Sequence, residues 1–125
     1  MTHVKKVVEN LVRQYNTRSP FVIGEQKEYE IFYSDFKDVG GMYCKVLDNK
    51  FIYINENLDA LSKQIVCAYL LWHGERYDSR NFLKLMLSKI HVPTFTQAEK
   101  EARFFALELV LFKEHSRNVF FYPAI

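Results

Sequence analysis

His73 closes an apolar segment, and its position suggests chemistry more strongly than that of any other titratable residue. Two His residues four positions apart on a helix can share one metal ion, and a Glu directly after the first can take a proton from metal-bound water. Here Tyr69 stands at the first of these positions and Leu70 at the second. Because a leucine side chain cannot accept a proton, hydrolysis by that route is chemically unavailable.

The remaining histidines and the cysteines offer little else for catalysis. His3, His91 and His115 have no ligand partner at a short helical spacing, so we expect them on the surface or in loops. Cys44 and Cys67 are too few for a disulfide framework, and both lie in apolar segments where free Cys behaves as a small hydrophobe.

Length and composition predict one domain over residues 1–125, since 49% hydrophobic residues are enough for a single core. The net charge of +2 comes from 17 basic and 15 acidic residues that are interspersed, which is weak reason to propose nucleic acid as a direct ligand. The longest apolar run, Ile65–Trp72, is far shorter than the roughly 20 residues that cross a bilayer. The first residues do not resemble a signal peptide, so we expect a cytoplasmic protein without membrane contact.

The spacing of apolar residues predicts four helices. A stripe at intervals of three and four marks residues 4–15, and a second, mostly buried helix spans Leu58 to Gly74 and carries the motif. Apolar residues on one side predict a third helix over Ser79–Ile90. Thr96 and Glu99 have the spacing of a capping box, which predicts a last helix to about Glu114.

Strand patterns occupy the region between the first two helices. Tyr29–Phe36 is rich in aromatic and β-branched residues, and Met42–Leu47 and Phe51–Ile54 form a hairpin pattern. The expected fold class is therefore α+β, with helices packed on a small three-stranded antiparallel or mixed sheet. The apolar tail Val119–Ile125 is expected to pack on the body or on a partner.

Four segments carry a resemblance to a known family. They are the opening helix followed by Tyr15–Phe21, the hairpin ending in Ile52–Leu58, the motif helix, and Glu101–Leu109, which is similar to the signature Glu-Ala-x-x-Phe-Ala-x-Glu-Leu. In this order, over residues 4–112, they resemble the ImmA/IrrE family of small zinc peptidases. That family is known in phages, integrative elements and bacterial stress responses for cutting transcriptional repressors, and the resemblance implies a zincin-like architecture.

The resemblance also assigns roles, position by position. His73 matches the second zinc-binding His and Glu101 the carboxylate ligand, whereas Tyr69 replaces the first zinc-binding His and Leu70 the general-base Glu. A tight zinc site needs three or four protein ligands, so we expect no zinc and no other cofactor, with His73 and Glu101 as weak metal candidates. The alternative is that this pair is a hydrogen-bonded core pair or makes no contact.

The expected function is that of a catalytically inactive, metallopeptidase-like protein. Tyr69, Leu70 and Trp72 form a candidate cleft for a protein segment, although core packing is the alternative explanation for them. The implied partner is a helix-turn-helix transcriptional repressor, bound without cleavage by an antirepressor in the lysogeny switch of a phage or mobile element, inside a bacterial host cell. Two alternatives stay open: an active zinc endopeptidase that uses His73, Glu101 and a further ligand, and a neutralising module with a non-transcriptional target.

Overall fold

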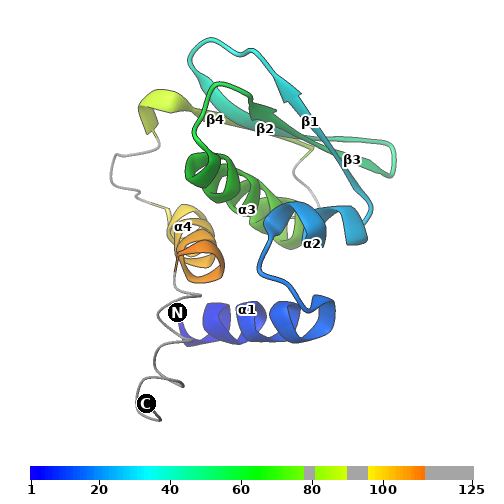
Figure 1. The fold of residues 1–125 in the computed structure, drawn as a ribbon, viewed down its shortest axis with the longest axis vertical. Helices are drawn as coiled ribbons and strands as arrows, with labels where there is room; N and C mark the ends of the chain where they lie inside the picture. The colour runs from blue at the N-terminus through cyan, green and yellow to red at the C-terminus, as the bar shows by residue number, and fades with distance from the viewer. Residues whose placement is uncertain (78–80, 90–95, 112–125) are drawn as a thin grey trace.

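Helices cover one face of a four-stranded mixed sheet in the computed structural model, which describes residues 1–77, 81–89 and 96–111 (Figure 1). The strand order is β1-β3-β2-β4, with β1 parallel to β3 and the other neighbours antiparallel. The elements are α1 (Thr2–Tyr15), α2 (Pro20–Gln26), β1 (Tyr29–Ser34), β2 (Val39–Val46), β3 (Asn49–Asn55), α3 (Ala60–Arg76), β4 (Phe82–Met86), a short 3-10 helix (Leu87–Lys89) and α4 (Gln97–Val110). This confirms the expected α+β class, with one strand more than predicted.

The two N-terminal helices follow from local signals. The predicted stripe of α1 buries Val4 and Val8, and the helix ends at Asn16, whose φ of 55° is left-handed. The structure then adds α2, which the sequence analysis did not predict as a helix. Ser19 caps it by accepting a hydrogen bond from the Val22 backbone N–H, and Pro20 occupies the first turn, where its missing N–H costs nothing.

The predicted hairpin is confirmed, with its turn placed slightly earlier. Val46 pairs with Asn49, so a two-residue turn at Leu47 and Asp48 joins β2 to β3. The strand predicted over Tyr29–Phe36 is present as β1, which lies parallel to β3.

The prediction of a helix over Ser79–Ile90 is wrong, because Phe82–Met86 form strand β4 beside β2. The apolar residues fit a helical stripe, but they also fit an alternating pattern. In the strand, Leu83 and Leu85 are the more buried side chains, whereas Phe82 and Lys84 are exposed. Pairing with β2 chooses between the two readings, and that pairing is not visible in a local stretch of sequence.

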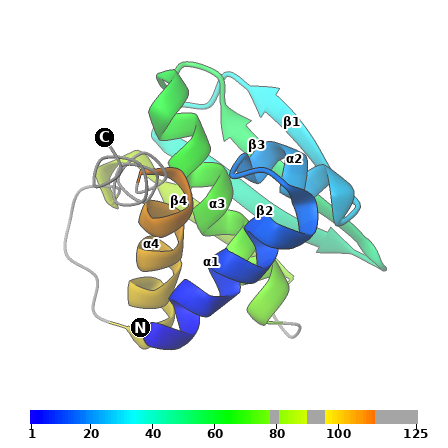
Figure 2. The same ribbon diagram turned by 60° about the horizontal axis from the view of Figure 1, so that its bottom comes forward.

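α3 lies at the centre of the molecule, between the sheet and the pair α1 and α4 (Figures 1 and 2). All residues from Val66 to Gly74 are buried, so this stretch has apolar neighbours on every side. The predicted cap of α4 at Thr96 is confirmed, since Thr96 accepts a hydrogen bond from the Glu99 N–H; the Glu99 carboxylate accepts one from the Thr96 hydroxyl instead of from the backbone N–H of a full capping box. The tail Val119–Ile125 lies outside the described residues. No helix in the described part has both the length and the apolarity to cross a membrane.

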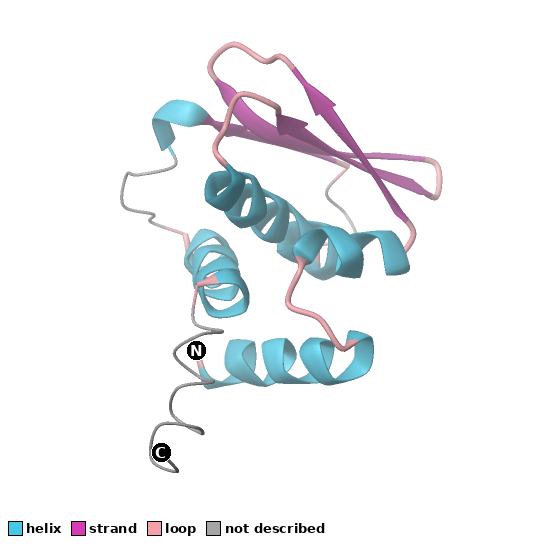
Figure 3. Ribbon diagram, viewed as in Figure 1, coloured by secondary structure: helices cyan, strands magenta, loops and turns pink. Residues whose placement is uncertain are grey.

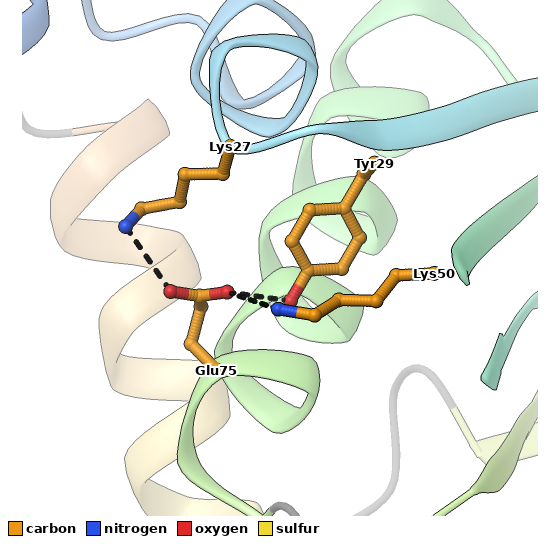
Figure 4. Close-up of polar contacts among 4 residues, drawn as sticks. All are labelled: Lys27, Tyr29, Lys50 and Glu75. Atoms are coloured by element: carbon orange, nitrogen blue, oxygen red, sulfur yellow. Dashed lines mark hydrogen bonds and ion pairs between the residues drawn. The ribbon is translucent and has the colours of Figure 1, made fainter. Parts of the chain in front are cut away.

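A carboxylate at the end of α3 ties the helix to three other elements (Figure 4). One Glu75 oxygen lies 3.1 Å from Lys27 Nζ; the other accepts a hydrogen bond from the Tyr29 hydroxyl at 2.7 Å and lies 3.4 Å from Lys50 Nζ. Burial raises the pKa of Glu75, but the hydrogen bond from Tyr29 and the two lysines together outweigh it, so the pKa lies below its ordinary value.

Glu75→Gln should therefore destabilise the protein in a pH-dependent way. Because the folded-state pKa is lowered, the contribution of Glu75 is fully present above its unfolded-state pKa and is lost as the pH falls through the folded-state pKa. We expect a loss of about 1.5 kcal/mol at pH 7 and a smaller loss at pH 3, measured by urea unfolding. The exposed Glu56→Gln variant is the control, and equal destabilisation at both pH values would contradict the charge-based explanation.

Candidate functional site

The three motif positions on α3, Tyr69, Leu70 and His73, are buried, and so is the cleft candidate Trp72. Tyr69 and His73 share one face of the helix, with ring centroids 4.8 Å apart, whereas Leu70 projects toward the sheet and Trp72 toward α4. The structure therefore does not gather Tyr69, Leu70 and Trp72 on one open cleft, and the predicted three-residue cleft needs correction.

Leu70 is a core residue. Its exposed fraction is 0%, and it packs under the sheet at Gly41, where an added Cβ would lie 2.9 Å from Leu70 Cδ1. The position where a zinc peptidase carries its general base thus holds an aliphatic group in van der Waals contact with a β-strand.

Trp72 faces the helical layer instead. Its ring centroid lies 5.0 Å from that of Phe105 on α4, and the Arg76 guanidinium lies 4.6 Å above the ring. The small cavity that it lines, of about 80 Å³, also includes Val7 and Leu11 of α1. Core packing therefore explains Trp72.

Tyr69 is the one member of the predicted cleft that lines the larger cavity between α3, α4 and β4. This cavity has a volume of about 190 Å³ and is mostly apolar. Its lining residues are Ser62, Ile65, Val66, Tyr69, Leu85, Arg103, Ala106 and Leu107. Tyr69 was predicted from the sequence, whereas the lining residues of α4 and β4 were not, since their contribution depends on how these elements pack.

His73 is enclosed between aromatic rings. It is 1% exposed, and its ring centroid lies 4.8 Å from that of Tyr69 and 5.6 Å from that of Tyr77. These contacts place the imidazole inside the protein body.

The structure pairs Glu101 with His3 rather than with His73. The Glu101 carboxylate lies 3.0 Å from His3 Nε2 and accepts a hydrogen bond from Gln97 Nε2 at 3.3 Å. His3 is on α1, and although it is exposed as expected, its contact with Glu101 was not predicted. The two residues are 98 positions apart, so no local signal could have identified the pair.

A zinc-binding donor set is not assembled in the described part of the chain. Within residues 1–77, 81–89 and 96–111, no three His, Cys, Asp or Glu side chains lie close enough to hold a metal ion. The two zinc ligands that the resemblance implies, His73 and Glu101, contact different residues. A zinc site needs three or four ligands around one point, so this arrangement does not fit one.

The two cysteines differ in accessibility. Cys67 on α3 is fully buried, and burial raises the pKa of its thiol well above the ordinary range. Cys44 on β2 is partly exposed.

Thiol titration should therefore count one reactive cysteine in the folded protein. At micromolar concentration, we expect Cys44 to react with Ellman's reagent at least about a hundredfold faster than Cys67, which must wait for an opening of the core. Cys44→Ser should remove the fast phase, and addition of denaturant should release the slow one. Rapid native reaction in Cys44→Ser would show that the core around Cys67 is open.

Comparison with known proteins adds a biological context to this geometry. No protein-family model matches the chain. The chain is similar to "Uncharacterized immunity region protein 2" of Bacillus phage phi105, with 27% identity over 113 residues, which is 88% of this chain and 69% of the phage protein. This relative is a phage immunity-region protein. At this distance the comparison does not assign the chain to the ImmA/IrrE family, and the resemblance to that family rests on the segments quoted above.

Proposed function

We propose that this protein is a catalytically inactive, metallopeptidase-like regulator of a phage or mobile element that binds a transcriptional repressor and controls it without cleaving it. The observation that carries the proposal is Leu70, a fully buried aliphatic residue where a peptidase needs a proton acceptor. The immunity-region relative supports the setting, a lysogeny switch in the cytoplasm of a bacterial host.

Regulation without cleavage works through mass action. A protein that binds one form of a repressor shifts the repressor population toward that form in proportion to its concentration. An antirepressor of this kind would hold the repressor in a form that cannot grip its operator.

The cavity beside Tyr69 is the docking site that we propose for a repressor segment. Its apolar lining comes from α3, α4 and β4, and Ser62, Ile65 and Leu107 are partly exposed at it. Its volume of about 190 Å³ suits an apolar side chain of a partner, which would anchor the complex.

A matched pair of variants tests this docking site. Ser62→Arg places a bulky cation at the cavity, whereas Leu61→Arg places the same side chain at the neighbouring exposed position of the same helical turn, outside the cavity. We expect Ser62→Arg to weaken binding to a candidate helix-turn-helix repressor at least tenfold, about 1.4 kcal/mol, by calorimetry. Leu61→Arg should bind like wild type; equal affinity of both variants would exclude the cavity as the docking site.

The absence of cleavage is tested separately with purified protein. After prolonged incubation with this protein, the intact mass of the repressor should be unchanged, and zinc analysis should find far less than one metal ion per chain. Stoichiometric zinc together with cleavage that His73→Ala abolishes would overturn the proposal in favour of a peptidase. Failure to bind any repressor, with stable capture of a protein outside transcription, would favour a neutralising module.

A further inference from the structure

The face of the sheet that points away from α3 carries an aromatic surface. The strand register aligns two rows of side chains across it. The first row is Phe32, Tyr53, Met42 and Lys84, and the second is Glu30, Phe51, Cys44 and Phe82. We call these eight residues the outer sheet face. Figure 3 shows that the four α-helices, α1 to α4, lie on the opposite side of the sheet.

Two large apolar side chains on this surface are exposed to water, which is unfavourable for them. Phe32 is 44% exposed and Phe82 is 53% exposed, at opposite edges of the sheet. Phe32 also stacks on Tyr53, with ring centroids 5.4 Å apart, and on Phe51, at 6.3 Å. The residues between Phe32 and Phe82 are half-buried, namely Met42, Cys44, Phe51 and Tyr53. The face is therefore a continuous, partly exposed apolar patch, and such patches mark interaction surfaces.

The charges on the outer sheet face indicate which partner fits. In the four strands, register places one acidic residue, Glu30, on this face at the β1 edge, and one basic residue, Lys84, at the β4 edge. In the described part of the chain, neither has an ion-pair partner closer than 4.0 Å. A face without net charge is poorly suited to a phosphate backbone, even though aromatic rings can stack on bases.

We infer that the outer sheet face binds the same face of a second copy of this protein. Aligned sheets pack face to face about 10 Å apart, and a two-fold axis that runs along the strands places the β1 edge of one copy over the β4 edge of the other. This arrangement brings Glu30 of each copy over the strand that carries Lys84 of the other. In the strand register, Lys84 lies two residues along β4 from the position that is level with Glu30. This offset is roughly 7 Å, which the two long side chains can span.

The expected association is weak. Four strands spaced about 4.8 Å apart, with about five residues each at roughly 3.3 Å, give a face near 320 Å², below the area of a standard stable interface. We therefore expect a reversible dimer with a Kd in the range of roughly 10–500 μM. The inference is independent of the proposed function, because it rests on the sheet rather than on the cavity beside Tyr69.

Sedimentation velocity over a concentration series tests the dimer, and a charge-swap cycle tests its geometry. Glu30→Lys and Lys84→Glu are each expected to weaken dimerisation at least threefold through like-charge repulsion, while the double variant restores it. Phe82→Glu should abolish the dimer below 1 mM. Val22→Glu, an exposed apolar position on α2, which lies on the opposite side of the sheet, is the control and should dimerise like wild type.

Cys44 provides a second measurement, because it lies on the outer sheet face while Cys67 is buried. If the faces meet, the reaction of Cys44 with a maleimide should slow as protein concentration rises through the dimer Kd. A monomer at millimolar concentration overturns the inference, as does a dimer that the charge swaps and Phe82→Glu leave unchanged. Loss of repressor binding in Phe82→Glu, with a monomeric wild type, would assign the face to the repressor instead.

Discussion

Leu70→Glu, which restores a carboxylate at the general-base position, should destabilise the protein by about 4 kcal/mol at pH 7. The side chain is fully buried beneath Gly41, so the new carboxylate would lose its hydration in an apolar core. Because a domain of this size has only about 5–15 kcal/mol of stability, much of the protein would unfold on mild heating. Urea unfolding followed by circular dichroism measures the loss.

The pH dependence separates buried charge from altered shape. Burial raises the pKa of the introduced carboxyl above its ordinary value of about 4.3, so the acid is neutral when folded at low pH. Below the unfolded-state pKa, the carboxyl is protonated in both states, and the variant is more stable there than at neutral pH. This extra stability is lost as the pH rises through the raised folded-state pKa. Leu70→Glu should therefore be closer to wild type at pH 4 than at pH 7.

Leu70→Met is the matched control, since it nearly conserves volume and should cost less than about 1.5 kcal/mol at both pH values. If Leu70→Glu were as stable as Leu70→Met at pH 7, position 70 would be open to solvent, and the argument that it is a core position would fail. Peptidase activity in folded Leu70→Glu would contradict the conclusion that His73 and Glu101 are not assembled into a metal-binding site.

Gly41→Ala should also cost about 3 kcal/mol, because the strand and α3 approach too closely for a methyl group. A Cβ at position 41 would lie 2.6 Å from Val66 Cγ1 and 2.8 Å from the Tyr53 backbone oxygen. Both are closer than real Cβ contacts, and the Tyr53 oxygen belongs to the neighbouring strand, which cannot move without disturbing the sheet. For a domain of this size, thermal denaturation should show a midpoint lower by roughly 10 °C.

Gly24→Ala on α2 is the control for the general effect of removing a glycine. Its Cβ would lie 3.2 Å from Ile31 Cδ1, the mobile end of a side chain, and alanine favours the helix. We expect a change within about 1 kcal/mol. Similar losses in Gly24→Ala and Gly41→Ala would mean that close packing of α3 on the sheet is not the cause.

Together these variants distinguish a disabled active site from a site that has become part of the core. Leu70 and Gly41 are in contact across the interface between α3 and the sheet, so the position of the missing base also holds the two layers together. Reversal by a single substitution is therefore not expected. The binding role that we propose would leave this core intact and would use the cavity that Tyr69 lines.

The local parts of the fold were readable from the sequence. The stripe of α1, the hairpin of β2 and β3, and the Thr96–Glu99 cap each depend on residues within a few positions of one another. The chemistry of the motif was readable for a simpler reason, because no environment makes Leu70 a base. These features need no knowledge of distant segments.

Only the tertiary structure decided the features that depend on distant partners. Phe82–Met86 became a strand because β2 offered it an edge, although the same residues also fit a helical stripe. Glu101 met His3 because α1 packs beside α4. Tyr69 and Trp72 line separate cavities because β4 packs beside the first and α1 beside the second. In each case the free energy that selects the arrangement comes from contacts between segments far apart in the chain, which local patterns do not record.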